Sequence, residues 1–327
     1  MNDNLKKVLI TARVHPYLVD TLTEKGYQVL YQPAISYDEL YHIIHGCIGL
    51  VVTTRLNIDS HILDNANQLQ WVARLGSGME MIDVDYAARH GIRCVSSPEG
   101  NCDAVGEQAI GMLLCVYDNI LKSNLELREG VWERERNRGF EIRDKTIGII
   151  GYGFTGTAFA RKLSGFDCQI LAYDKYRKGY GHEGVKEAPM EEIFRKADVV
   201  SLHVPLTVET THMVNTAFLQ SFTGSVFLIN TSRGQVIHTP DLVEGLKSGK
   251  VAGACLDVLE NERPETMDKE EKIQFEYLLH AENVLITPHI AGYTHEASFK
   301  MALVVLRKLG ILEQEGTPHI RGYNLSR

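Results

Sequence analysis

Residues 146–156 read TIGIIGYGFTG, a run of strand-forming apolar residues that ends in a glycine-rich turn. The glycines Gly151, Gly153 and Gly156 have GxGxxG spacing, and an amphipathic stretch, residues 157–163, follows them. In such a unit the first glycine permits a tight turn, the second lets the backbone approach a pyrophosphate, and the third lets helix and strand pack closely. The phosphates then face the helix N-terminus. The sequence therefore predicts a dinucleotide-binding turn, which also includes Tyr152, Phe154 and Thr155.

Asp174 lies eighteen residues beyond the last of these glycines, at the end of a predicted strand, residues 169–173. A carboxylate at this position accepts hydrogen bonds from ribose hydroxyls, so the sequence favours NAD over NADP. A nearby base can instead accommodate a 2′-phosphate, and three bases follow: Lys175, Arg177 and Lys178. We interpret them as a solvated turn and leave some use of NADP open.

Short apolar runs alternate with amphipathic stretches along most of the chain. We expect strands at 8–11, 28–31, 49–53, 69–75, 93–96, 146–150, 169–173, 199–203, 226–230, 251–256 and 284–287. Such alternation is typical of parallel sheets that are covered by helices. The predicted fold class is α/β, with two Rossmann- or flavodoxin-like doubly wound parallel-sheet domains and an interdomain cleft.

The expected domain boundary follows the first series of strands. Residues 1–102 plus 293–327 would form a flavodoxin-like, substrate-binding domain, and residues 103–292 would form an NAD-binding Rossmann domain. We predict a long helix from an N-cap at Asp103 to about residue 127, then a solvated connection over 128–143. A final helix is expected from residue 296 to about 315, followed by a polar tail that packs back on the first domain.

Composition excludes several classes of function. A net charge of −8 disfavours a nucleic-acid partner, and no apolar run approaches the length of a membrane helix. The N-terminus resembles no signal peptide, so we expect a cytoplasmic protein. The six cysteines lie far apart without CxxC spacing, and we interpret them as reduced packing residues. The pair His42 and His45 has no evident third ligand, so we expect no metal.

Three further segments follow predicted strands, at the edge where ligands bind in open α/β sheets. They read HVPLT at 203–207, NTSRG at 230–234 and TPHIAG at 287–292. Together with residues 74–83, 151–156 and 257–262, they resemble the D-isomer-specific 2-hydroxyacid dehydrogenase family, in the order typical of that family and over nearly the whole chain. The resemblance implies an NAD-dependent oxidoreductase that acts on the CH–OH group of a D-2-hydroxy acid.

By this resemblance, Arg233 would bind the carboxylate and keto oxygen of the substrate through its planar guanidinium. His289 would be the general acid in reduction and the general base in oxidation. Glu262 would accept a hydrogen bond from His289, with Glu260 as its nearest rival. Arg263 stands where the family has proline, and the 27-residue interval from Glu262 to His289 is longer than usual for the family.

The resemblance also implies residues that contact the substrate and the cofactor. The segment Leu75, Gly76, Ser77 and Gly78 would offer backbone N–H groups to the substrate carboxylate, although Ser77 replaces an apolar residue. Arg55 resembles an arginine that phosphoglycerate dehydrogenases use near the substrate phosphate. Further cofactor contacts are expected from Val105, His203, Val204, Pro205, Thr210, Thr231, Ser232, Asp257 and Gly292, with Asp257 holding the nicotinamide carboxamide.

Several points stay open at this stage. The chain resembles the short phosphoglycerate dehydrogenase-like form without a regulatory domain, but the acid and the physiological direction are not determined. Formate oxidation is disfavoured, because that branch of the family has glutamine where Glu262 stands. The alternative is an NADH-sensing, corepressor-like binding protein with little turnover. A homodimer is expected through the NAD-binding domain, with contacts from the helix after Asp103 and the region of Trp132.

Overall fold

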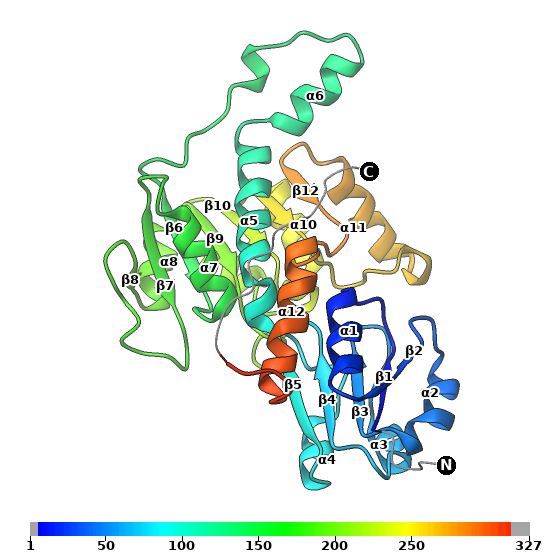
Figure 1. Ribbon diagram of the computed structural model, residues 1–327. Coiled ribbons are helices and arrows are strands. Elements are labelled where there is room, and N and C mark those ends of the chain that lie inside the picture. The colour runs from blue at the N-terminus through cyan, green and yellow to red at the C-terminus, as the bar shows by residue number, and fades with distance from the viewer. Residues whose placement is uncertain (1–5, 315–327) are drawn as a thin grey trace, which may run out of the picture. The chain divides into compact units, whose positions relative to one another are not determined.

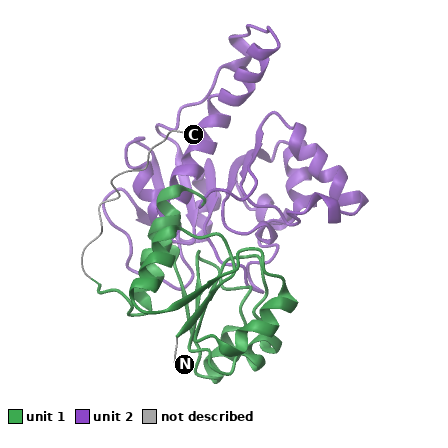
Figure 2. Ribbon diagram, turned by 45° about the vertical axis from the view of Figure 1, so that its right-hand side comes forward, with its two compact units in different colours: residues 1–101, 293–327 green, residues 102–292 purple. Residues whose placement is uncertain are grey.

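The computed structural model describes residues 6–314. Contacts divide the chain into two compact units (Figure 2). Unit 1 contains residues 1–101 and 293–327, and unit 2 contains residues 102–292. The predicted polar tail lies largely outside the described residues.

Unit 1 is a parallel sheet with helices on both faces (Figure 1). Its described strands run in the order β2-β1-β3-β4-β5, which is the flavodoxin-like order. The strands are β1 (Lys7–Ile10), β2 (Gln28–Tyr31), β3 (Gly49–Val52), β4 (Trp71–Arg74) and β5 (Arg93–Ser96). The helices are α1 (Pro16–Glu24), α2 (Tyr37–Ile43), the 3₁₀ turn η1 (Ile44–Gly46), α3 (Ser60–Asn65), α4 (Val84–Arg89) and α12 (His295–Lys308).

The alternation of side chains along the strands divides the core of unit 1 in two. On β1, Leu9 packs with Leu40 of α2 and Ile62 of α3, whereas Val8 packs on the other face with Leu18 of α1 and Val305 of α12. Polar residues start these helices: the side chains of Ser36, Asp59, Asp83 and Thr294 accept from first-turn N–H groups of α2, α3, α4 and α12.

Unit 2 is a second parallel sheet, with described strands in the order β12-β11-β10-β9-β6-β7-β8. The strands are β6 (Thr146–Ile150), β7 (Gln169–Tyr173), β8 (Lys186–Glu187), β9 (Val199–Leu202), β10 (Val226–Asn230), β11 (Val251–Leu256) and β12 (Val284–Ile286). The helices are α5 (Pro98–Tyr117), α6 (Ile120–Arg128), α7 (Phe154–Leu163), α8 (Met190–Lys196), α9 (Thr216–Gln220), α10 (Thr239–Lys247) and α11 (Lys269–His280). The order reverses between β6 and β9, so the loops after these strands open the crevice that binds ligands in such sheets.

Two apolar layers sandwich this sheet. Ile147 and Ile149 of β6 pack with Leu113 of α5 and Phe159 of α7. Ile150 faces the opposite layer, which includes side chains from α8, α9, α10 and α11. The predicted α/β class with two parallel sheets is confirmed, and the short edge strand β8 is an addition that the sequence did not reveal.

The expected helix at Asp103 is wrong in its start and its length. Helix α5 begins five residues earlier, at Pro98, whose fixed φ suits a first helical position. It ends at Tyr117, and Asn119 adopts a left-handed φ of 51° before α6 begins. The carboxylate of Asp103 instead pairs with Arg161 and Lys162 of α7.

Two further segments of unit 2 were described by the structure. Between α6 and β6 the described chain forms only one short 3₁₀ turn, η2 (Glu135–Asn137), in keeping with the predicted connection. Helix α11 begins at Lys269, because Asp268 and Glu271 form a capping box there. No helix in residues 6–314 is both long and apolar enough to cross a membrane.

Candidate active site

The glycine turn after β6 has the geometry of a phosphate cradle. Gly151 has φ +94°, and a Cβ there would lie 2.4 Å from the His203 carbonyl oxygen. A Cβ on Gly156 would lie 2.1 Å from the Gly151 carbonyl oxygen. A Cβ on Gly153 would meet none of the described atoms within 4 Å. The fold itself therefore requires Gly151 and Gly156, whereas Gly153 leaves open space at the N-terminus of α7.

Tyr152 is held on every side by the loop that follows β7. Its N–H donates to Asp174 Oδ2 at 2.8 Å, and its carbonyl oxygen accepts from Arg177. Its buried ring stacks on Tyr180 with centroids 4.8 Å apart, and its hydroxyl lies 3.2 Å from His182 Nε2. Phe154 of the same turn is half exposed. These contacts fix the glycine turn against the predicted ribose site.

The carboxylate of Asp174 accepts three backbone hydrogen bonds. Burial acts to raise its pKa, but hydrogen bonds from the backbone N–H groups of Arg177, Tyr152 and Tyr176 outweigh burial and lower the pKa. Two of the basic residues that follow already have partners within the protein. Lys175 Nζ lies 2.5 Å from Glu209 Oε2. Arg177 donates to Tyr152. This arrangement fits an acid that accepts ribose hydroxyls better than a site for a 2′-phosphate.

Two buried polar atoms among the described residues lack a partner at the ends of β9 and β10: His203 Nδ1 and Thr231 Oγ1. His203 is buried, which lowers its pKa to about 3, and its Nε2 lies 2.8 Å from Ser201 Oγ. Val204 is half-buried, and Thr210 donates to the Pro205 carbonyl in the adjoining turn. Because buried polar atoms are normally paired, such orphans beside the glycine turn fit a site completed by a bound dinucleotide.

A histidine–carboxylate pair lies after β12. His289 Nδ1 is 3.0 Å from Glu262 Oε2, and both side chains are partly exposed. The hydrogen bond to Glu262 raises the pKa of His289, while burial and the charge of Arg233 oppose the shift. His289 has a left-handed φ of 54°, a conformation that histidine tolerates better than most residues. The hydrogen bond to Glu262 orients the ring through Nδ1 and favours its protonated form.

Buried Asp257, at the end of β11, shapes the loop that carries His289. Its Oδ1 accepts from Thr287 Oγ1 at 2.5 Å and from Ile290 N at 2.8 Å, and its Oδ2 accepts from Ala291 N at 2.8 Å. Its carbonyl oxygen also accepts from His289 N. Gly292 closes this segment. The resemblance implies that Asp257 holds the nicotinamide carboxamide; in the structure its carboxylate accepts hydrogen bonds from the loop that carries His289.

Arg233 follows β10 and is oriented locally. Its Nη1 donates to the Ser232 carbonyl at 2.7 Å, and its own carbonyl accepts from Asn230 Nδ2 at 2.9 Å. The hydroxyl of buried Ser232 donates to Asn230 Oδ1 at 2.8 Å. Arg233, Glu262 and His289 follow β10, β11 and β12, which are neighbours in the sheet. Unit 2 thus gathers a guanidinium, an imidazole and its carboxylate at one edge.

The rival acid, Glu260, faces elsewhere. Its Oε1 lies 2.5 Å from His212 Nε2, and its Oε2 accepts from Thr239 N at 2.6 Å. Glu262 is therefore the carboxylate that pairs with His289. The resemblance had assigned His212 no role.

Residues 75–78, predicted to bind the substrate carboxylate and called here the substrate nest, lie in unit 1, after β4. Gly76 has φ +134°, and a Cβ there would overlap the Arg74 guanidinium. Two of the expected N–H donors are already used: Leu75 N donates to Val52 O, and Gly76 N donates to Ser97 Oγ. Among the described residues no partner occupies the N–H groups of Ser77 and Gly78, so these remain for a ligand. Arg55 donates to the Thr11 carbonyl at 2.9 Å.

Val105, expected at the cofactor, is buried in α5. The glycine after it packs closely on α7.

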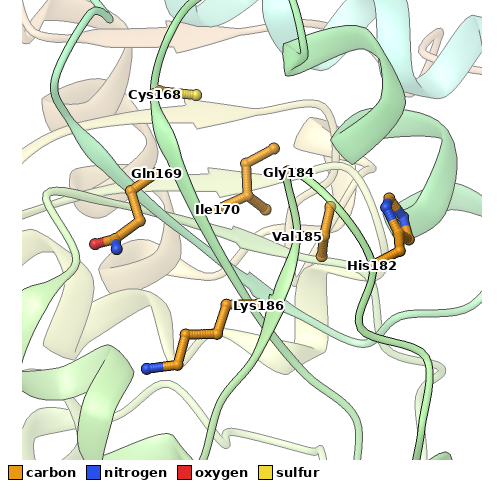
Figure 3. Close-up of a pocket in the computed structure, with 7 residues that line it drawn as sticks. All are labelled: Cys168, Gln169, Ile170, His182, Gly184, Val185 and Lys186. Atoms are coloured by element: carbon orange, nitrogen blue, oxygen red, sulfur yellow. The ribbon is translucent and has the colours of Figure 1, made fainter.

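A cavity of about 470 Å³ lies beside β7 and β8 of unit 2 (Figure 3). It is lined by Cys168, Gln169, Ile170, His182, Gly184, Val185 and Lys186. None of these residues belongs to the predicted site, although His182 contacts the Tyr152 hydroxyl. Within residues 6–314 no cluster of three histidine, cysteine or acidic residues could hold a metal.

A known family model matches most of unit 2. The model described as "D-isomer specific 2-hydroxyacid dehydrogenase, NAD binding domain" matches residues 110–291, more than half of the chain. The chain belongs to the D-isomer specific 2-hydroxyacid dehydrogenase family. The resemblance inferred from the motifs is therefore confirmed, and so is the NAD-binding character of the matched region.

Members of this family with assigned activities differ in their substrates. Glyoxylate reductase of Pyrococcus furiosus is 34% identical over 93% of this chain and 91% of its own length. D-3-phosphoglycerate dehydrogenases of Archaeoglobus fulgidus and Homo sapiens are 30% and 31% identical over 98% and 90% of this chain. The chain spans only 59% and 54% of those two enzymes.

Solved structures of the family share the fold. The apo-structure of D-lactate dehydrogenase from Escherichia coli has a TM-score of 0.78 at 29% identity, covering 96% of this chain and 98% of that chain. A D-lactate dehydrogenase from Treponema pallidum has a TM-score of 0.75 at 28% identity, covering 93% and 97%. The match extends over nearly the whole chain in both cases.

Proposed function

We propose that this protein is an NAD-dependent D-2-hydroxyacid dehydrogenase, which interconverts a 2-hydroxy acid and the corresponding 2-keto acid. The observation that carries the proposal is the hydrogen bond of 3.0 Å between His289 and Glu262, at the same sheet edge as Arg233. A proton donor with a raised pKa beside a guanidinium suits reduction of a keto group next to a carboxylate.

Each residue of the proposed site has a separate role. The bound nicotinamide supplies or takes up the hydride, and the turn of Gly151 to Gly156 with Asp174 would hold the dinucleotide. Arg233 binds and orients the substrate through its carboxylate and keto oxygen. His289 gives a proton from Nε2 to the keto oxygen in reduction and takes it back in oxidation. Glu262 stabilises the imidazolium and fixes the orientation of the ring.

The free N–H groups of Ser77 and Gly78 would bind the substrate carboxylate, and Arg55 is the candidate contact for a phosphate. Arg74 is buried whereas Arg55 is exposed, so Arg55 is the better candidate of the two. A phosphoglycerate dehydrogenase-like substrate is therefore one of the options, beside smaller keto acids.

The decisive experiment measures NADH oxidation against a panel of 2-keto acids, including glyoxylate, hydroxypyruvate, pyruvate, phenylpyruvate, 2-oxoglutarate and phosphohydroxypyruvate. Replacement His289→Ala should lower kcat by about 10²–10⁴-fold, while NADH binding is retained. His280→Ala, which removes an exposed imidazole from α11, is the matched control. If NADH binds but no acid is reduced, the protein is instead an NADH sensor.

We also propose a homodimer formed through unit 2. Helix α6 and the segment after it expose an apolar surface with Ile120, Leu121, Leu125, Leu127, Val131 and Trp132, and Trp132 is 80% exposed. In Figure 1 α6 projects beyond the sheet of unit 2. A second copy would cover such a surface. We place the dimer in the cytoplasm, because all six cysteines are free thiols, as a reducing compartment favours.

A further inference from the structure

Glu260 connects three segments of unit 2 that meet behind the catalytic pair. Its carboxylate accepts from His212 Nε2 at 2.5 Å and from Thr239 N at 2.6 Å. Its carbonyl oxygen accepts from Gln235 Nε2 at 3.0 Å. The side chain of Glu260 is largely buried, being 23% exposed, so water competes little for these contacts.

Two of these contacts fix the segment that follows Arg233. Gly234 lies so close to the loop that a Cβ there would be 1.8 Å from the Leu259 carbonyl oxygen. Thr239 is the first residue of α10, and His238, at the N-cap position, makes no side-chain capping bond in the described structure. Glu260 therefore supplies the missing cap, and its negative charge suits the N-terminus of the helix.

His212 is itself held in place. It has a left-handed φ of 52°, and its N–H donates to the Gln235 carbonyl at 2.7 Å. Its ring lies 4.8 Å from the ring of His238, which pairs with Asp241. A cavity of about 220 Å³ borders this pair, and the other charged groups that line it are Asp268, Glu270 and Glu271 of the α11 region. The imidazole is thus a fixed donor rather than a mobile surface group.

The residue after Glu260 is anchored in the opposite direction. Asn261 Nδ2 donates to Glu271 Oε2 at 3.3 Å, and its Oδ1 accepts from Arg263 N and Thr266 Oγ1. Glu262 lies between these anchors and projects to His289. Its position therefore depends on how firmly its two predecessors are held.

We propose that Glu260 is a positioning residue, which together with His212 locks the loop bearing Glu262 against the segment bearing Arg233. The inference deepens the proposed function and rests on it. Glu260 touches no reacting atom. It acts through Glu262, and loosening it should weaken the contact of Glu262 with His289.

The test compares Glu260→Gln and His212→Asn with the wild-type protein. A glutamine has one acceptor oxygen for two donors, so Thr239 N–H or His212 loses its partner. Asparagine tolerates the left-handed φ of residue 212 but is too short to replace the imidazole donor. His212→Gln keeps a donor of suitable length and should restore activity. Glu270→Gln, a carboxylate that lines the same cavity, is the matched control.

We expect Glu260→Gln and His212→Asn to lower kcat for ketoacid reduction about three- to tenfold, with the dissociation constant of NADH changed less than about twofold. The fall of kcat with rising pH, the basic limb of the profile, should move to lower pH. The reason is that a weaker hydrogen bond to Glu262 raises the pKa of His289 less. In a Glu262→Gln background, adding Glu260→Gln should leave kcat and that limb unchanged. Such non-additivity identifies action through Glu262.

A lower melting temperature in Glu260→Gln with unchanged kcat and basic limb would overturn the inference, because Glu260 would then be only structural. A further readout needs no turnover: the pKa of His289, followed by NMR with ¹⁵N-labelled histidine and assigned through His289→Asn, should fall in Glu260→Gln. If the wild-type protein reduces no ketoacid, the proposed function fails. The NMR titration still decides whether Glu260 positions Glu262.

Discussion

His289 and Glu262 are 27 residues apart in the chain, yet their Nδ1 and Oε2 atoms lie 3.0 Å apart. The carboxylate raises the pKa of His289 through this hydrogen bond. The protonated form is the one that can donate to a keto oxygen. In the proposed reaction, this pair sets the pH range in which each direction proceeds.

Replacing Glu262 by glutamine should lower the pKa of His289. Reduction needs the imidazolium, so its rate is highest below this pKa and falls as pH rises through it, while oxidation shows the opposite dependence. In Glu262→Gln, the fall of the reduction rate and the rise of the oxidation rate should both occur at lower pH. The kcat for reduction should fall about tenfold or more on the alkaline side. Glu265→Gln, in the 3₁₀ turn Pro264–Thr266 that follows Glu262, is the control. Unchanged limbs would show that another group titrates.

Asp257→Asn should destabilise unit 2 as well as slow the reaction. Asparagine has one acceptor oxygen, so its amide nitrogen would face the N–H of either Ile290 or Ala291, both of which donate to the carboxylate. Leaving such a buried donor unpaired costs about 1–3 kcal/mol. Urea unfolding measures the loss, and Asp144→Asn, an exposed acid in a turn, should leave stability nearly unchanged. Wild-type stability in Asp257→Asn would contradict the role given to Asp257 in the catalytic loop.

Alanine at Gly153 and at Gly156 should have different effects. The Cβ of Gly153→Ala meets open space, so the fold should keep its stability while NADH binding weakens about tenfold or more. The Cβ of Gly156→Ala overlaps the Gly151 carbonyl and should cost about 1–3 kcal/mol of stability. Calorimetry and thermal unfolding separate the two effects. Equal loss of stability in both variants would show that Gly153 serves packing and not the cofactor.

Glu209→Gln should improve the binding of NADPH relative to NADH. The substitution releases Lys175 from its contact with Glu209 and removes a negative charge from beside the predicted ribose site. Because both side chains are exposed, the shift in the ratio of dissociation constants should be small, about two- to fivefold. Titration of nucleotide fluorescence measures both constants. A ratio unchanged at low salt would place the adenosine ribose away from Lys175.

Leu125→Asp should convert the proposed dimer into monomers. The side chain is 50% exposed on α6, and a charge there would be buried in a contact between two copies. Sedimentation equilibrium distinguishes the two states. Val208→Ser provides the control, since Val208 is 97% exposed on another loop of unit 2. A wild-type chain that sediments as a monomer would refute the proposal directly.

Local patterns predicted much of the fold. The strand at 251–256 was located to the residue, because six consecutive strand-forming or small residues end at an acid. The start of α5 was missed, because Asp103 has the character of an N-cap while Pro98, earlier in the chain, already begins the helix. The break at Asn119 was also missed, since a left-handed residue in a long apolar stretch leaves little trace in periodicity.

The site shows the same division. The GxGxxG turn, Asp174 and the three strand-end segments were predictable, because their chemistry follows from residue type and spacing along the chain. The resemblance favoured Glu262 over Glu260, but residue type alone does not separate them, because both acids stand in one short loop and only their partners distinguish them. Those partners, His212 and His289, are 48 and 27 residues away.

The sequence by itself determined the α/β class, the family and the residue types that carry the chemistry, because strand periodicity and glycine spacing are local properties. Only the tertiary structure decided which N–H groups of the substrate nest are already used, that Asp257 supports the loop of His289, and that Glu260 caps α10. Each of these depends on a hydrogen bond between residues that are distant in the chain. Local patterns do not encode such pairings, because they form only when the strands assemble into a sheet.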